Sequence, residues 1–298
     1  MLSVHHREVG KEVNTHFDIS RTYCIFLSFI FCSLLTADPH FMTWYGNHFS
    51  YHGACDLVFI HNPRFSNWTG LDLHIRTEHM MNKAYSFISN AALRIGNDVL
   101  EVIADGRHFI NGNIGALLPA NIGGYPVNKV VKQTCRGNQQ NKKCWSSMIF
   151  IVTLGEQDMI QIKVASEMVH VDVIGTPSSV KGSVGLMGTY PAQRGGKFAR
   201  DGTTFVRNPD TFAQHWQVLN TEPKLFQGTR YPQHPEKCIP SVAPAKEGRH
   251  LRHVERNEDR LAAEDACSHV TGPDWEFCVT DVMATGDYGM AATVYDGL

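Results

Sequence analysis

Hydrophobic and polar residues alternate along much of the chain, which predicts β-strands with one face on a core and the other on water. The clearest case is 160–164, where Ile160, Ile162 and Val164 alternate with Gln161 and Lys163. A period of two is the pattern of a half-buried strand. Similar alternation or short apolar stretches occur at 57–61, 71–76, 85–88, 92–95, 99–103, 125–131, 147–154 and 169–173.

Turn-forming residues separate these stretches, for example Asp105-Gly106, Asn111-Gly112 and Gly155-Glu156. Many short strands at intervals of roughly 8–12 residues are typical of an antiparallel sandwich or barrel. No long helical period occurs between residues 41 and 175, which argues against a doubly wound α/β fold. We therefore predict a mainly β protein built on an antiparallel, sandwich-like or barrel-like domain.

The pattern changes after this region. Residues 182–202 are rich in glycine and basic side chains, which predicts a long loop. Asp210 is then the expected N-cap of a short helix. Prolines and polar residues predict a connector at 227–254, and helical spacing after it predicts a small α-rich, cysteine-containing tail at 255–298.

An apolar run near the start predicts export. No charge interrupts residues 24–35, Arg21 precedes them, and Ala37 is a small residue suited to cleavage. The run is too short to span a bilayer, which needs roughly 20 residues, but it suits a signal peptide at 1–37. The β domain then occupies 38–226. An uncleaved signal anchor, or a strand buried in the fold, is the alternative.

Two of the eight cysteines would leave with the signal peptide, and an even number in an exported chain indicates disulfides. No C-x-x-C spacing supports a zinc or thioredoxin-like site. Six cysteines allow fifteen pairings, and the sequence does not choose among them. Spacing favours two local bridges, which leaves one long-range pair: Cys135 with Cys144, Cys267 with Cys278, and Cys55 with Cys238.

Composition narrows the function classes. Hydrophobic residues make up 43% of the 298 residues, which is too apolar for a mostly disordered protein. The 27 Lys and Arg against 29 Asp and Glu give a net charge of −2, so nucleic acid is not an expected partner. Asn67-Trp68-Thr69 is an N-glycosylation sequon, which agrees with export.

Motifs for catalysis or metal binding are missing from the sequence. The 16 histidines include no H-E-x-x-H, and His48 and His52 would lie too far apart on a strand to share an ion. We expect His74, His79 and His170 to have structural or surface roles on polar strand faces. No G-x-S-x-G elbow or phosphate-binding loop occurs. We predict no enzyme activity, cofactor or metal.

Ordered motifs at both ends of the β region resemble the von Willebrand factor type D domain of extracellular adhesive and gel-forming proteins. The stretch DPHFMTWYG at 38–46 is similar to that family's G-D-P-H-a-x-T-F-D-G, where a is aromatic. FSYHGACDLV at 49–58 is similar to its F-x-x-x-G-x-C-x-Y-x-L, GLMGTY at 185–190 to its G-L-C-G-N-Y, and FAQHW at 212–216 to its F-x-x-x-W. The resemblance covers roughly 38–220.

Departures from the family pattern change what the resemblance implies. Met187 stands where the family has a cysteine, so one typical disulfide cannot form and Cys55 needs another partner. Tyr45, Thr189 and Pro191 stand where family members often bind calcium, and they supply almost no anionic oxygen, so we expect no calcium site.

The combined expectation is a secreted structural or adhesive protein that contacts extracellular proteins or matrix glycoproteins, with possible self-association. A secreted hydrolase and a lipid- or ligand-binding extracellular module are the alternatives, because a fold does not fix a function.

Overall fold

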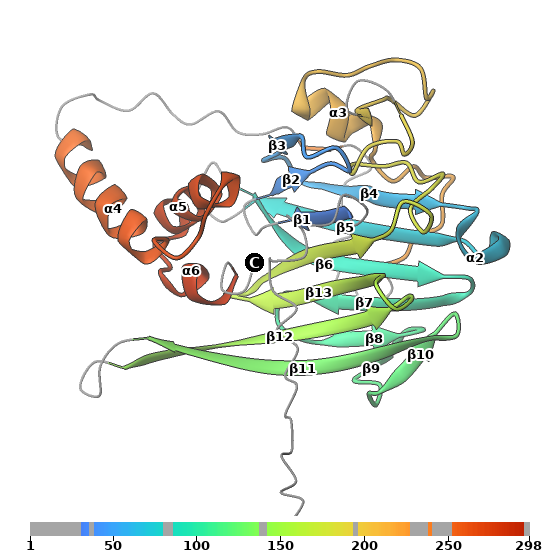
Figure 1. The fold of residues 1–298 in the computed structure, drawn as a ribbon, viewed down its shortest axis with the longest axis horizontal. Coiled ribbons are helices and arrows are strands. Elements are labelled where there is room, and N and C mark those ends of the chain that lie inside the picture. Colours follow the sequence, from blue (N-terminus) through green and yellow to red (C-terminus); the bar gives the residue numbers. More distant parts are fainter. Residues whose placement is uncertain are drawn as a thin grey trace, which may run out of the picture.

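The computed structural model describes residues 31–35, 39–79, 86–136, 142–192, 196–226, 238–239 and 252–294. The chain is mainly β, as predicted, with helices concentrated near its C-terminal end (Figure 1). The strands are β1 (Phe31–Leu35), β2 (His40–Met42), β3 (His48–Ser50), β4 (Cys55–Asn62), β5 (Leu71–His79), β6 (Ser86–Ile95), β7 (Asp98–Ile103), β8 (His108–Ile110), β9 (Asn113–Ile114), β10 (Ala120–Ile122), β11 (Tyr125–Arg136), β12 (Lys143–Thr153), β13 (Met159–Ala165) and β14 (Met168–Gly175).

These strands form two open antiparallel sheets. One has eight strands in the order β10-β11-β12-β13-β14-β1-β2-β3, and the other has six in the order β4-β5-β6-β7-β8-β9. The sheets lie face to face, and β14 contacts β6 across the space between them. The helices are α2 (Phe65–Trp68), α3 (Pro209–His215), α4 (Arg252–Ala266), α5 (Pro273–Thr285) and α6 (Gly289–Thr293).

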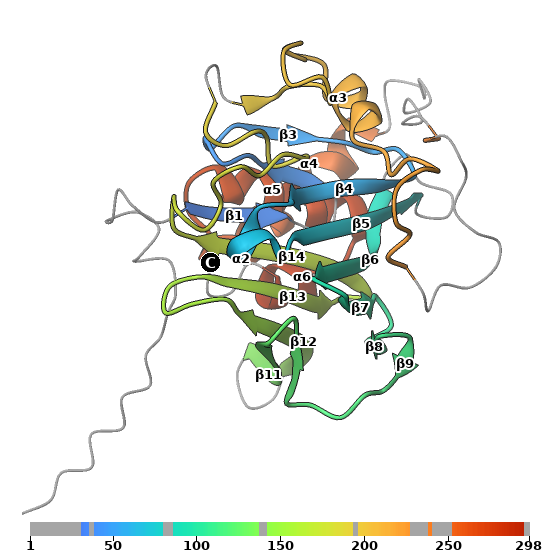
Figure 2. The same cartoon turned by 90° about the vertical axis from the view of Figure 1, so that its right-hand side faces the viewer.

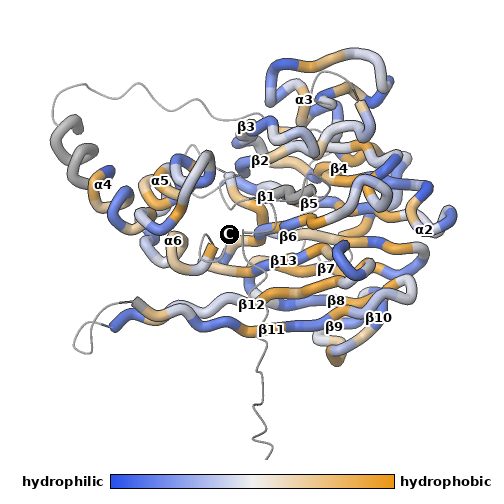
Figure 3. Tube along the Cα trace, in the orientation of Figure 1, coloured by the Kyte–Doolittle hydropathy of each residue, from blue (hydrophilic) through white to orange (hydrophobic). Residues whose placement is uncertain are grey.

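The core between the sheets contains the apolar residues of the alternating pattern. Ile160 and Ile162 of β13 are fully buried there, as are Leu73 of β5 and Leu93 of β6. Along the strands, hydrophobic and hydrophilic residues alternate visibly (Figure 3). Each strand therefore directs alternate side chains into one shared core.

Part of the polar face of β13 and β14 is shielded from water, which corrects one expectation. The C-terminal helices cover it, and Ala165 and Met168 join their apolar residues in a second core (Figure 1). Lys163 and His170 are buried beneath these helices, and the Lys163 ammonium donates to the Val294 carbonyl at 3.1 Å. Burial is tolerated here because the buried cation has a hydrogen-bond acceptor.

Residues 31–35, assigned above to the signal peptide, form a strand inside the eight-stranded sheet. β1 pairs with β14 at five successive positions, from Phe31 with Gly175 to Leu35 with Val171, and Leu35 also pairs with Phe41 of β2. The rest of 1–38 lies outside the described residues. The same short apolar segment therefore forms a strand within the sheet and also fits the targeting pattern.

Several element boundaries differ from the predicted ones. β6 is continuous through 89–91, because Ser89 and Asn90 bond Glu78 and Glu101 of the neighbouring strands at 3.0 and 2.9 Å. The N-cap of α3 is Asn208 rather than Asp210: its side chain accepts from the Thr211 amide, and Pro209 occupies the first helical turn.

The C-terminal region is α-rich, as predicted, although α4 begins at Arg252, before residue 255. Most of the predicted connector at 227–254 lies outside the described residues. None of the helices in the described part of the chain is long and apolar enough to cross a bilayer.

Candidate functional site

The six cysteines predicted to remain after export form three disulfides. The structure joins Cys55 to Cys238, Cys135 to Cys144 and Cys267 to Cys278, which are the pairs that spacing favoured. The first closes a loop of 183 residues, whereas the other two span 9 and 11. One bridge therefore ties distant parts of the chain, and two brace local elements.

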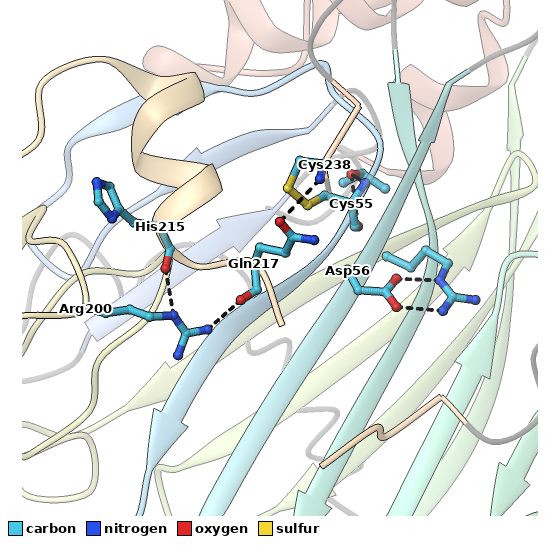
Figure 4. The surroundings of a disulfide bond; sticks show 8 residues. Cys55, Asp56, Arg200, His215, Gln217 and Cys238 are labelled. Carbon is cyan, nitrogen blue, oxygen red and sulfur yellow. Dashed lines mark hydrogen bonds and ion pairs between the residues drawn. A yellow bond between two sulfur atoms is a disulfide. The ribbon is translucent and has the colours of Figure 1, made fainter. Parts of the chain in front are cut away.

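The Cys55–Cys238 disulfide attaches the segment at 238–239 to the start of β4 (Figure 4). Ala54 and Ile239 exchange two backbone hydrogen bonds of 2.9 Å, and the Cys238 amide donates to the Gln217 side chain at 3.3 Å. Gly53 is required beside them, because a Cβ there would lie 2.5 Å from the Ile239 carbonyl oxygen. The bridge is thus reinforced by one backbone pair and by one bond to a side chain.

The motifs at the two ends of the type D resemblance meet in space. The Trp44 amide donates to the Met187 carbonyl at 2.9 Å, and the rings of Tyr45 and Tyr190 lie 5.9 Å apart. Met187 is fully buried and packs in the main core. A thioether therefore fills the position at which the family has a cysteine, and Cys55 bonds elsewhere.

The positions that would correspond to a calcium site have other contacts. The Tyr45 hydroxyl accepts from the Ala192 amide. The exposed Asp201 carboxylate accepts from the amides of Thr203 and Thr204 and from the Thr204 hydroxyl, and these bonds hold the pKa of Asp201 far below its usual range. Among the described residues, no group of three or more His, Cys, Asp or Glu is arranged to hold a metal ion.

A charged network covers the outer face of the six-stranded sheet. Asp72 accepts from His61 at 2.5 Å and from Arg94. Burial alone raises the pKa of Asp72, but the bonds from His61 and Arg94 outweigh burial and lower it. Next to it, burial lowers the pKa of His74 to about 4, so this imidazole is neutral at physiological pH.

The network has one feature of a hydrolase, a histidine oriented by a carboxylate. Within the described residues, however, no hydroxyl or thiol side chain is hydrogen-bonded to His61. The same face also holds a structural ion pair, in which the buried Arg76 guanidinium binds both oxygens of Asp56 at 2.6 and 2.8 Å. The observed bonds connect neighbouring strands and activate no nucleophile.

A second group of titratable residues lies between the eight-stranded sheet and the C-terminal helices. His40 of β2 lies 3.4 Å from the fully buried Asp281 of α5 and stacks on Phe277 with ring centroids 4.1 Å apart. Burial raises the pKa of Asp172 to about 7 and lowers that of His170 to about 3. His40 thus links the sheet to α5, and His170 and Asp281 are buried beside it.

A narrow pocket between the sheets is apolar. It is lined mainly by core side chains, among them Trp44, Ile60, Phe65 and Leu154. Such a lining offers little to orient a polar substrate.

The accessible features are surface elements. Asn67 of the sequon is exposed on α2, and Trp68 next to it is 73% exposed, with the Arg64 guanidinium 5.4 Å from its ring centroid. At the opposite end of the sandwich, the β11–β12 hairpin extends past its neighbouring strands (Figure 1). Sequence analysis missed this hairpin, although a run of basic residues without any acidic one marks it from 125 to 145.

Comparison with protein-family models and with curated proteins finds no match for this chain.

Proposed function

We propose that this chain is a secreted structural or adhesive protein of the von Willebrand type D kind, which acts through contacts with extracellular proteins or matrix glycoproteins. The observation that carries the proposal is the set of three disulfides, because such bonds form and persist in oxidising compartments. The exposed sequon at Asn67 supports the same compartment.

The distribution of polar chemistry supports a surface role over catalysis. His74 and His170, whose pKa values are strongly lowered, are buried, and the exposed Asp201 carboxylate is bonded within its own turn. The exposed features are projecting elements, the α2 turn and the β11–β12 hairpin, which suit contact with another molecule.

The test is expression of the full chain in a eukaryotic secretory cell line, followed by separation of cytosol, medium and extracellular matrix. We expect the chain in the matrix fraction, with three disulfides by mass and a glycan that Asn67→Gln removes. A secreted protein of similar size serves as the control for non-specific retention in the matrix fraction. A chain kept in the cytosol with free thiols would overturn export, and a chain found only in the medium would overturn the adhesive role.

A further inference from the structure

The outer half of the β11–β12 hairpin has no neighbouring strand among the described residues. β11 and β12 pair from Val127 with Val152 to Arg136 with Lys143. β10 pairs only with 125–127 of β11, and β13 pairs only with 148–153 of β12. Residues 128–136 and 142–147, called here the hairpin arm, therefore run past their neighbours (Figure 1). Figure 2 shows β11 and β12 at the lower margin of the fold.

Two features hold the arm in place. An isolated two-stranded hairpin is only marginally stable in water. The Cys135–Cys144 disulfide crosses its outer end, and α6 packs against both strands. The ring of Trp145 lies against Gly289, where a Cβ would come within 2.3 Å of the indole nitrogen. The arm is thus a braced projection.

The arm concentrates positive charge in a chain that is otherwise acidic. Between Tyr125 and Trp145 the sequence has five basic residues and no acidic one, although the whole chain has a net charge of −2. Four of these side chains are exposed: Lys129, Lys132, Lys142 and Lys143. Because the Debye length is about 8 Å at physiological ionic strength, neighbouring cations on one short ribbon act together.

The arm also places two cationic residues in opposite positions of its strands. The register sets Arg136 directly opposite Lys143, and like charges in opposite positions of two strands are destabilising. The two cationic residues lie next to the disulfide, which keeps the strands together in spite of their repulsion.

The positive charge of the arm also indicates which kind of partner binds it. From Asn128 onward β11 is an open edge, which in principle offers pairing to a second copy of the chain. Lysines on such an edge oppose that pairing, since two copies would bring their cations together. An anionic partner is attracted by the same cations, and a polymer carries enough charges to meet several of them at once.

We propose that the hairpin arm binds an anionic polysaccharide, carboxylated or sulfated, through its exposed lysines. The proposal rests on the extracellular role proposed above, because such polymers occur in extracellular matrices. The register and the alternation of side chains place Lys132 and Lys143 on one face of the arm and Lys129 on the other, so the arm presents cations on both faces of one ribbon that a polymer can contact. Release of counterions from the polymer makes the binding strongly salt-dependent.

The experiment measures binding of the full-length secreted chain to immobilised dextran sulfate across a range of salt concentrations, with uncharged dextran as the reference surface. The arm variant is Lys132→Gln/Lys142→Gln/Lys143→Gln. The control variant, Lys181→Gln/Arg207→Gln/Lys224→Gln, removes the same charge from exposed positions elsewhere. Intact mass verifies three disulfides in each protein before binding is compared.

We expect the arm variant to bind at least about tenfold more weakly and to lose roughly two to three from the slope of log affinity against log salt, while the control variant changes less than about twofold. Equal losses in both variants, or no binding by the unaltered chain, would overturn the proposal. Binding to phosphatidylserine vesicles but not to dextran sulfate would also overturn it, in favour of a membrane surface.

Light scattering tests the role of the lysines in preventing self-pairing. An arm variant that dimerises but still binds dextran sulfate with unchanged affinity would overturn the proposal, because the lysines would then serve only to protect the edge.

The failure of the polysaccharide proposal can be distinguished from the failure of the proposed extracellular role. If the chain is secreted and retained in matrix but does not bind dextran sulfate, only the polysaccharide proposal is wrong. If the chain stays in the cytosol, the proposed extracellular role is wrong.

Discussion

Removal of the Cys55–Cys238 disulfide, by the double substitution Cys55→Ala/Cys238→Ala, should destabilise the β domain more than removal of any local bridge. The bonded residues are 183 apart, and the chain-entropy relation for a loop of that length gives about 5 kcal/mol. The matched control, Cys135→Ala/Cys144→Ala, opens a bridge between residues 9 apart, for which the same relation gives about 2.7 kcal/mol.

Equilibrium unfolding in urea measures both changes, followed by the fluorescence of the buried Trp44 and Trp216. We expect the long-range variant to lose about 2.5 kcal/mol more free energy of unfolding than the control, because only loop length separates the two entropies. Equal losses in the two variants, or a larger loss in the control, would refute the reasoning that Cys55–Cys238 acts by closing the domain.

Three further predictions follow from individual contacts. The secreted chain should begin before Phe31, because loss of β1 would leave 171–174 of β14 paired with β13 alone and expose its other edge; a mature N-terminus at Asp38, found by intact mass, would contradict this. As the pH is lowered from 6.5 to 4, the free energy of unfolding should fall by about 1.4 kcal/mol per pH unit. His74 and His170, with pKa values of about 4 and 3, stay neutral in the folded chain and take up protons only on unfolding. Asp172, with a pKa of about 7, is protonated in the folded chain and releases its proton on unfolding, which cancels the contribution of one histidine. His74→Gln should remove most of this slope in urea titrations at several pH values, and an unchanged slope would count against the assignment. Asp56→Ala should cost about 3–5 kcal/mol in urea unfolding because it leaves the buried Arg76 unpaired, whereas Asp105→Ala, which breaks an exposed pair with Arg107, should cost less than about 1 kcal/mol; similar costs would contradict the role of burial.

The fate of β1 connects export to folding. While a signal sequence is recognised, its apolar run is an element of the targeting machinery. In the folded chain the same residues lie between β14 and β2. The segment cannot be bound by the targeting machinery and paired in the sheet at the same time. The N-terminus of the mature protein therefore shows whether the folded state retains β1.

Local features of the sequence determined the strands and the cysteine pairs. Period-two alternation identified β13 and β14, because side chains on a strand point to opposite faces whatever surrounds them. Local spacing favoured Cys135–Cys144 and Cys267–Cys278, and this left Cys55 with Cys238. The α-rich tail followed from its helical spacing.

Only the tertiary structure decided what covers each face and edge. Lys163 and His170 sit at positions that the pattern assigns to water, yet helices distant in sequence bury them. The apolar run at 31–35 gives the same local signal in a signal peptide and in a buried strand. The basic residues at 128–136 and 142–143 lie on a projecting arm because the pairing with β10 and β13 ends before it. Periodicity reports how one segment divides its own side chains, whereas burial and exposure depend on which other segments pack against it.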